Sequence, residues 1–97
     1  MPSLIVRFLQ PLPLTIVSRR GTRCTLSIHV EPTHDRHELG MVEEGHCGHW
    51  AFHHFSPREH GRIETILREG IPVRPGSVFS RCCQAMAAAG LVEISVQ

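Results

Sequence analysis

The order in which strand-like and helix-like segments follow one another limits this chain to few architectures. Four segments with strand character, at residues 3–9, 12–18, 24–30 and 46–55, come before any helical pattern. Two helical segments follow, and a last strand is expected at residues 91–96. Because strands and helices do not alternate, the order β-β-β-β-α-α-β argues against a parallel βαβ sheet. It predicts an α+β fold: a mainly antiparallel sheet of four to five strands with two C-terminal helices packed on one face.

Length and composition narrow the class of protein. Ninety-seven residues are enough for one core, which predicts a single compact domain over residues 1–97. A content of 41% hydrophobic and 20% charged residues is typical of globular proteins, and the net charge of +1 gives no general attraction to polyanions. The chain has no lysine, which excludes Schiff-base chemistry.

The apolar segments carry no targeting signal. The amino-terminal stretch lacks the basic start and the cleavage site of a secretory leader, and no run of about 18 apolar residues could span a bilayer. We therefore expect a cytoplasmic protein without a membrane partner. Its four cysteines are expected to be reduced.

Residues 24–30 carry the clearest strand pattern. Apolar side chains alternate with polar ones, which predicts a half-buried strand whose inner face holds Cys24, Leu26, Ile28 and Val30. The turn "SRRGT" predicts a hairpin with residues 12–18. Residues 31–45 are polar and acidic, and they predict a long loop with at most a short strand around Met41 and Val42.

The helical segments have clear start and stop signals. In "FSPREHGRIETILREG", Ser56 is the expected N-cap, Pro57 takes the first helical position and Glu59 completes a capping box. Gly70 is expected to end this helix. A second helix is predicted over residues 77–89, with Gly90 and Leu91 closing it in a Schellman motif.

The stretch "GHCGHWAFHH", residues 45–54, predicts a strand rich in imidazoles. With a period of two, Trp50 and Phe52 share one face with His54, while His49 points to the other face. We expect Trp50 and Phe52 to face inward as core anchors, because the chain has a single tryptophan and few aromatic residues.

The histidines suggest a metal site. All eight lie between positions 29 and 60, and imidazole and thiolate groups are preferred ligands of zinc. No cofactor is required by the sequence, but zinc is the candidate if one is bound. The predicted ligands are His34, His37, Cys47 and His49.

A catalytic pair is less favoured than binding. Cys47 has His46 and His49 near it in sequence, but adjacent strand residues point in opposite directions, and no other feature indicates an activated nucleophile. We therefore expect the protein not to be an enzyme.

A protein partner is the preferred function. The turn at residues 19–23 is basic, whereas the segment around residue 43 is acidic and carries two apolar side chains. This polarity is typical of a small non-enzymatic binding protein, such as an adaptor, a subunit or an inhibitor, that acts on a protein or nucleoprotein partner. A homo-oligomer is also compatible with it. The expected contact residues are Arg19, Arg20, Arg23, Met41, Val42, Glu43 and Glu44.

A DNA-binding alternative comes from the two helices. Two helices joined by a short link and followed by a strand resemble part of a winged helix, whose second helix enters the major groove. Only one strand follows, and the basic side chains are few. The residues that would contact DNA are Arg74, Ser77, Ser80, Arg81 and Gln84.

Overall fold

The computed structural model describes residues 3–97, which form two compact units. The four-stranded unit is one continuous segment, Leu12–Gly61, and the three-stranded unit combines residues up to Pro11 with Arg62–Gln97. Both sheets are antiparallel, and two α-helices complete the structure. The α+β class is therefore confirmed.

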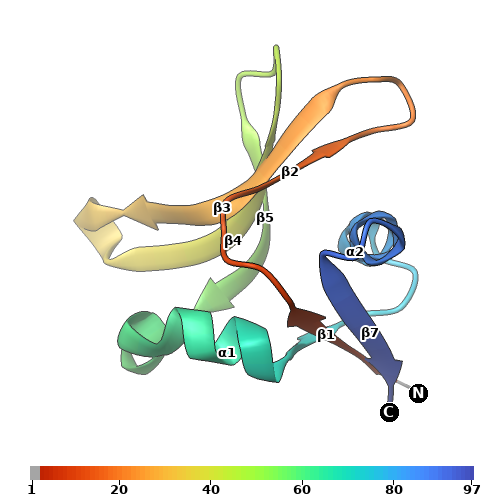
Figure 1. The fold of residues 1–97 in the computed structure, drawn as a ribbon. Coiled ribbons are helices and arrows are strands. Elements are labelled where there is room, and N and C mark those ends of the chain that lie inside the picture. Colours follow the sequence, from red (N-terminus) through yellow and green to blue (C-terminus); the bar gives the residue numbers. More distant parts are fainter. Residues whose placement is uncertain (1–2) are drawn as a thin grey trace. The chain divides into compact units, whose positions relative to one another are not determined.

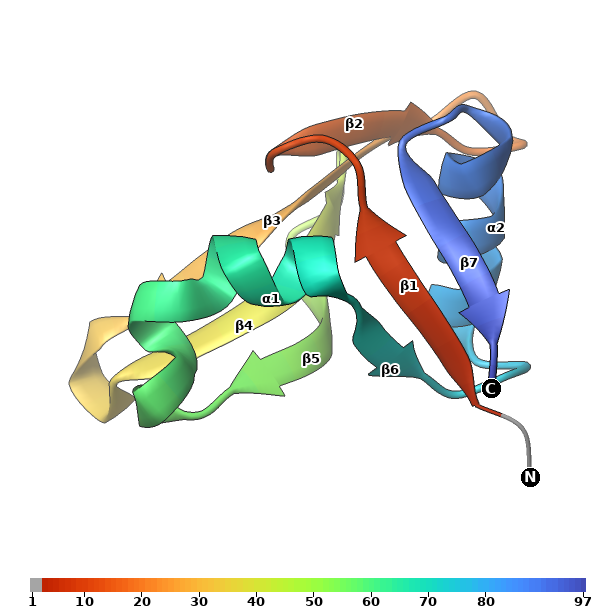
Figure 2. The same ribbon diagram turned by 60° about the horizontal axis from the view of Figure 1, so that its bottom comes forward.

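The three-stranded unit is built around the first strand. Strand β1 (Leu4–Phe8) lies between β6 (Ile71–Val73) and β7 (Val92–Val96), as Figure 2 shows. Helix α1 (Ile63–Glu69) contacts β1, and helix α2 (Val78–Ala88) contacts β7. The buried side chains of this sheet are Val6, Phe8, Ile71, Val73 and Val92.

Helix α2 has the predicted ends. The Ser77 hydroxyl accepts a hydrogen bond from the backbone N–H of Ser80, and the Leu91 N–H donates to the Met86 carbonyl at 2.9 Å. Gly90, with φ of 77°, donates to the Ala87 carbonyl at 3.0 Å. These two bonds form the expected Schellman motif.

Helix α1 begins later than predicted. The 3₁₀ segment η2 (Pro57–Arg62) comes first, and α-helical geometry starts only at Ile63. The predicted capping contact is present, because the Ser56 backbone N–H donates to the Glu59 carboxylate at 2.9 Å. Gly61 lies inside the 3₁₀ segment and, as a poor helix former, does not favour continuation of an α-helical turn. Gly70 ends the helix as expected.

The four-stranded unit contains β2 (Leu14–Val17), β3 (Arg23–Glu31), β4 (Arg36–Glu43) and β5 (His49–Phe55), in that spatial order (Figure 1). A short 3₁₀ turn, η1 (Pro32–His34), joins β3 to β4. The predicted β2–β3 hairpin is confirmed. The inner face of this sheet has the buried side chains Leu14, Cys24, Leu26, Leu39 and Phe55.

The prediction of one sheet is wrong, because the first two strands do not belong together. Strand β1 pairs with β6 and β7, and β2 pairs with β3. The segment between β1 and β2 contains Pro11 and Pro13, which have no backbone N–H to continue a ladder. The sequence Ile71–Val73, expected to be part of a connecting segment, supplies the additional strand β6.

The prediction of a long loop over residues 31–45 is also wrong. Eight of these residues form β4, which is hydrogen-bonded to a strand on each side. The sequence of β4 did not indicate a strand, because Glu38 and Gly40 are unfavourable strand residues and polar and apolar side chains do not alternate regularly along it. Glu38 is nevertheless nearly buried, since the His49 imidazole hydrogen-bonds to its carboxylate and His54 Nε2 lies 3.3 Å from it.

Strand β5 forms where predicted, but its side chains do not alternate regularly. The register shifts opposite Leu39 and Gly40, which pair with His53 and Ala51, so that Phe52 is the extra residue of a β-bulge. The bulge places His49 and His54 on the same face. The prediction that Trp50 is a core anchor is wrong, because this residue pairs with Met41 on the Leu39 face of the sheet but is 39% exposed.

Within the described residues, no helix has the length and apolar character needed to cross a membrane.

Candidate metal centre

Three potential metal ligands meet at one end of the four-stranded unit. Asp35, His37 and His60 each present an atom that can bind a metal, and these three atoms lie within 4.8 Å of one another. Among residues 3–97, no other group of three histidine, cysteine, aspartate or glutamate residues meets this criterion. The cluster combines the chain's single aspartate with two half-buried imidazoles.

Local backbone structure brings the three residues together. Asp35 follows η1 with φ of 48°, a left-handed conformation that aspartate tolerates better than most residues. His37 is the second residue of β4, and its partner across the ladder is Phe55 at the end of β5. His60 lies in η2, which begins directly after β5, so the turn of this segment returns its imidazole to the same end of the sheet.

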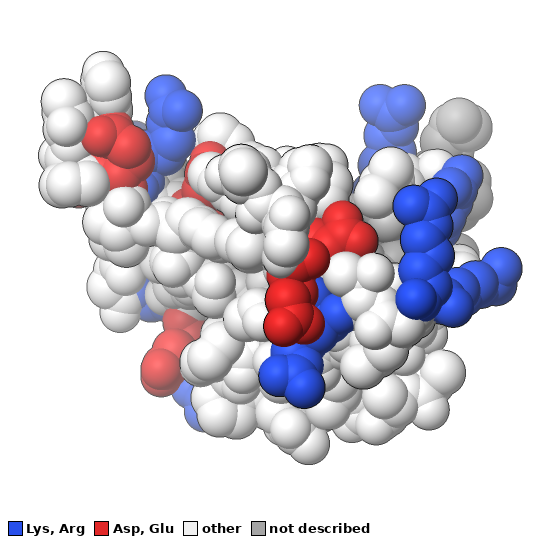
Figure 3. Space-filling view, turned by 90° about the horizontal axis from the view of Figure 1, so that it is seen from above, with Lys and Arg blue, Asp and Glu red and all other residues white. Residues whose placement is uncertain are grey.

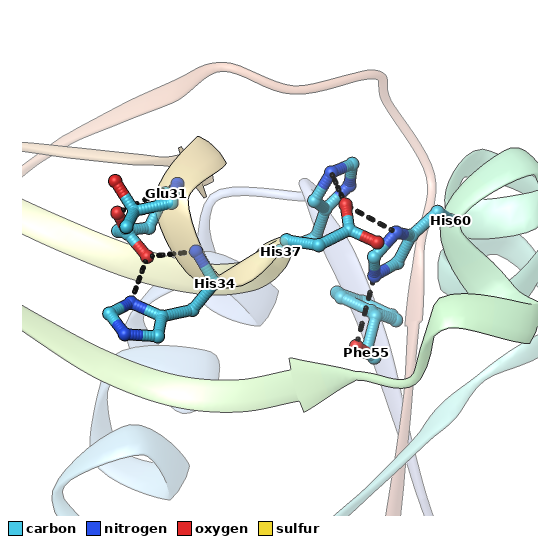
Figure 4. Close-up of polar contacts among 7 residues, drawn as sticks. Glu31, His34, His37, Phe55 and His60 are labelled. Atoms are coloured by element: carbon cyan, nitrogen blue, oxygen red, sulfur yellow. Dashed lines mark hydrogen bonds and ion pairs between the residues drawn. The ribbon is translucent and has the colours of Figure 1, made fainter.

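The imidazole rings of His37 and His60 lie against each other (Figure 4). Asp35 Oδ1 lies 4.0 Å from His37 Nε2 and 3.7 Å from His60 Nδ1. The two imidazole rings are parallel, with their centroids 3.6 Å apart. Both rings are largely shielded, at 22% and 15% side-chain exposure, whereas the Asp35 carboxylate is 73% exposed and free to adjust.

A hydrogen bond determines which nitrogen of His60 is available as a ligand. His60 Nε2 lies 3.3 Å from the Phe55 carbonyl oxygen, which can only accept, so Nε2 must carry the proton. In the neutral ring, Nδ1 then has a free lone pair, and this is the atom nearest to Asp35. A lone pair and a carboxylate oxygen that face each other repel, and a cation between them removes this repulsion.

The predicted ligand set is not brought together. His34 is 70% exposed and hydrogen-bonds to Glu31, as Figure 4 also shows. Cys47 lies exposed in the turn before β5, at the other end of β4 from His37, and His49 is hydrogen-bonded to Glu38. Of the four predicted ligands, only His37 belongs to the cluster.

A second group of imidazoles lies on the outer face of the same sheet. The two carboxylate oxygens of Glu38 contact different rings: Oε1 lies 2.5 Å from His49 Nε2, and Oε2 lies 3.3 Å from His54 Nε2. His29, which pairs with Glu38 in the ladder, stacks on His49 with ring centroids 4.4 Å apart.

These contacts shift two pKa values. The hydrogen bond from His49 lowers the pKa of Glu38, and the nearby charges of His49, His54 and Arg36 add to this effect. Partial burial lowers the pKa of His29, and repulsion from His49 lowers it further. Both shifts disfavour protonation of these groups in the folded state.

The predicted partner-binding residues lie at one end of the four-stranded sheet, and the cluster of Asp35, His37 and His60 lies at the other end. The turns that join β2 to β3 and β4 to β5 both lie there, because the strands are antiparallel. The Glu44 N–H donates to the Arg23 carbonyl at 2.8 Å, which connects the basic segment to the acidic one. Arg19, Arg20 and Glu44 are exposed, and Met41, Val42 and Glu43 are half-buried.

The residues of the DNA-binding alternative do not form the expected surface. Strand β6 separates the two helices, so they are not joined by a short link. Ser80 is only 2% exposed and its hydroxyl donates to the Ser77 carbonyl, which contradicts its expected position on an exposed helix face. Arg74, Arg81 and Gln84 are exposed. Figure 3 shows the basic side chains of one face in small separate groups, with acidic and uncharged side chains between them.

Asp35, His60 and Glu38 were not predicted as site residues. Asp35 was recognisable as the only aspartate, directly between the two predicted ligands His34 and His37. His60 was hidden inside a strong helix signal. Glu38 carried no signal, because its role depends on the bulge in β5.

Comparisons of this chain with models of protein families, with curated proteins and with solved structures gave no significant match.

Proposed function

We propose that this chain is a small non-enzymatic binding protein whose four-stranded unit holds a divalent transition-metal ion at Asp35, His37 and His60. The observation that carries the proposal is the convergence of three ligand atoms within 4.8 Å. The orientation of His60 supports it, because the Phe55 carbonyl binds its proton-bearing nitrogen and leaves Nδ1 directed at the carboxylate.

The chemistry of the ligands favours zinc and its neighbours over calcium or magnesium. Two imidazoles and one carboxylate suit zinc, nickel, cobalt or iron, whereas the harder cations prefer oxygen ligands alone. Ligand atoms that share one zinc lie about 2.0–2.1 Å from it. Two ligand atoms of one tetrahedral zinc ion are then about 3.3 Å apart. The contacts of 3.7 and 4.0 Å to Asp35 must therefore shorten, and the two parallel imidazole rings must turn toward a common point.

Metal titration of the untagged protein tests this proposal. We expect isothermal titration calorimetry to give one zinc ion per chain, and cobalt to give the visible absorption of a low-symmetry site. His37→Ala and His60→Ala should each lower the affinity at least about tenfold. Circular dichroism establishes that each variant is folded.

His34→Ala is the matched control. His34 lies three positions before His37 in the sequence. Its imidazole hydrogen-bonds to Glu31 and is not part of the cluster. We expect this substitution to leave zinc affinity within about twofold of the parent protein. Equal losses in all three variants, or no stoichiometric binding by the parent, would contradict the proposal.

We propose a protein partner as a second activity, at the charged end of the four-stranded sheet. The proximity of Arg23 to Glu44 supports it, because both charged turns lie on a single end of one sheet. Complementary charges of this kind mainly affect the rate of association. The partner should therefore associate more slowly at high salt and with the double variant R19E/R20E, and unchanged rates in both cases would contradict this.

A further inference from the structure

The outer face of the four-stranded sheet places three imidazoles around one shielded carboxylate. The Glu38 side chain is 12% exposed, and its two oxygens are contacted by the Nε2 atoms of His49 and His54. A carboxylate only accepts, so the neutral His49 ring donates its Nε2 proton to Glu38 Oε1, while His54 Nε2 lies 3.3 Å from Oε2. Each ring binds a separate oxygen, which is an arrangement for sharing protons and not for enclosing one metal ion.

The bulge in β5 creates this arrangement. In a regular strand, positions 49 and 54 would point to opposite faces. The extra residue at Phe52 reverses the alternation, and both rings then lie on the face of Glu38. Bulges that redirect side chains are frequent next to functional sites.

The third ring depends on a glycine. A Cβ at Gly40 would lie 3.1 Å from the nearest ring carbon of both His29 and His49. Without that Cβ, the two rings approach until their centroids are 4.4 Å apart with planes 6° from parallel. Ser27 Oγ holds the His29 ring through Nε2 at 3.3 Å.

The charged groups around this face are few. Strand β4 contributes Glu38 and the nearby Arg36, and β5 contributes His49 and His54. Strand β3 contributes His29 and, at its two ends, Arg23 and Glu31, the latter paired with Arg36 in the ladder. Glu38 therefore balances the charge of one imidazolium, and Arg36 offsets part of its field. The His29 ring lies face to face with His49, and Ser27 Oγ lies 3.3 Å from its Nε2.

We propose that the Glu38–imidazole cluster is a proton-responsive element in which acidification separates His29 from His49 and loosens the outer face of the sheet. The Glu38 carboxylate lies against His49 and His54. Positive charge on both His29 and His49 places two like charges in parallel rings whose centroids are 4.4 Å apart, and partial shielding from water weakens the screening of this repulsion. The His29–His49 stack therefore separates, and the backbone amides of the strands that carry the two rings lose protection against hydrogen exchange.

Amide hydrogen exchange of the full chain tests this proposal, with each rate divided by its intrinsic value at the same pH. Protection of the β4 and β5 amides should fall at least about fivefold between about pH 7.5 and about pH 5.5, on either side of the ordinary imidazole range. His29→Gln keeps a hydrogen-bonding side chain without a titrating ring, so its loss of protection should stay below about twofold. His34→Gln, outside the cluster, should behave as the parent protein does.

A second variant keeps the test decisive if His29→Gln alters the fold. Glu38→Gln removes the negative charge that contacts the His49 and His54 imidazoles, yet it keeps an accepting oxygen. Without that charge, repulsion between charged rings is uncompensated, and the loss of protection between about pH 7.5 and about pH 5.5 should be larger than in the parent protein. Unchanged protection across the pH range in the parent, or a loss in Glu38→Gln no larger than that of the parent, would overturn the proposal.

Discussion

The imidazole of His46 stacks on the indole of Trp50, with ring centroids 4.9 Å apart and planes 12° from parallel. The single tryptophan thus contacts another exposed side chain on the sheet surface and is 39% exposed. We predict that Trp50→Ala lowers the free energy of unfolding by no more than about 1 kcal/mol. Leu39→Ala, at a fully buried position of β4, should cost about 2–5 kcal/mol. Urea denaturation followed by circular dichroism measures both, and similar costs would contradict the exposed position of the indole.

Gly40 should tolerate no larger residue. A Cβ there would lie 2.9 Å from the Trp50 carbonyl oxygen and 3.1 Å from two imidazole rings. We predict that Gly40→Ala lowers the free energy of unfolding by about 1–3 kcal/mol, since backbone must shift to accept it.

Gly48→Ala is the matched control for that substitution. It lies in the turn before β5, and a Cβ there would have no neighbour closer than 3.9 Å. A stability within about 0.5 kcal/mol of the parent is expected, as for other exposed positions. If chemical denaturation ranked the two variants equally, the close approach at Gly40 would be incorrect.

Glu38 should make the protein sensitive to strong acid. The hydrogen bond from His49 lowers its pKa in the folded state below the value of an unfolded chain. The unfolded chain therefore binds the proton first, and the stability from this group is complete above about pH 4.5 and is lost as the pH falls through the folded-state pKa. Glu38→Gln should flatten this acid limb in a pH series of denaturation curves, while Glu64→Gln, at an exposed position of helix α1, should leave it in place.

The cysteines should differ strongly in reactivity. Burial raises the pKa of the Cys83 thiol to about 12, with a smaller contribution from Cys82, and Cys83 has no exposed surface. Cys47 is exposed. We predict that iodoacetamide near neutral pH modifies Cys47 first and leaves Cys83 unmodified in the folded protein, because the thiolate is the reactive form. Peptide mapping by mass spectrometry measures the order, and early modification of Cys83 would show that its helix is not packed as described.

Short sequence motifs were sufficient to predict several of the points at which helices begin or end. Ser77, Gly90 and Leu91 define the ends of α2 through hydrogen bonds within a few residues, and such bonds depend little on the remainder of the chain. The same holds for the contact between Ser56 and Glu59.

Long-range pairing was not predictable in this way. Strand β1 pairs with segments more than 60 positions away, and no periodicity in residues 3–9 indicates that choice over pairing with the next strand. The bulge at Phe52 has the same origin, since it follows from how β5 fits β4. Because the bulge decides which rings meet Glu38, the histidine face could not be derived from a period of two.

The four-stranded unit is one segment of the chain, whereas the three-stranded unit combines two segments, and this difference affects the order in which strands can pair during synthesis. Every strand of the segment Leu12–Gly61 finds its partners within that segment, so this sheet can assemble while the ribosome is still adding later residues. Strand β1 is made first, yet it has no partner until β6 and β7 have left the exit tunnel. Strand β1 thus precedes the other described strands in the chain yet is among the last to be paired, and its apolar residues Val6 and Phe8 stay without their partners until β6 and β7 have been made.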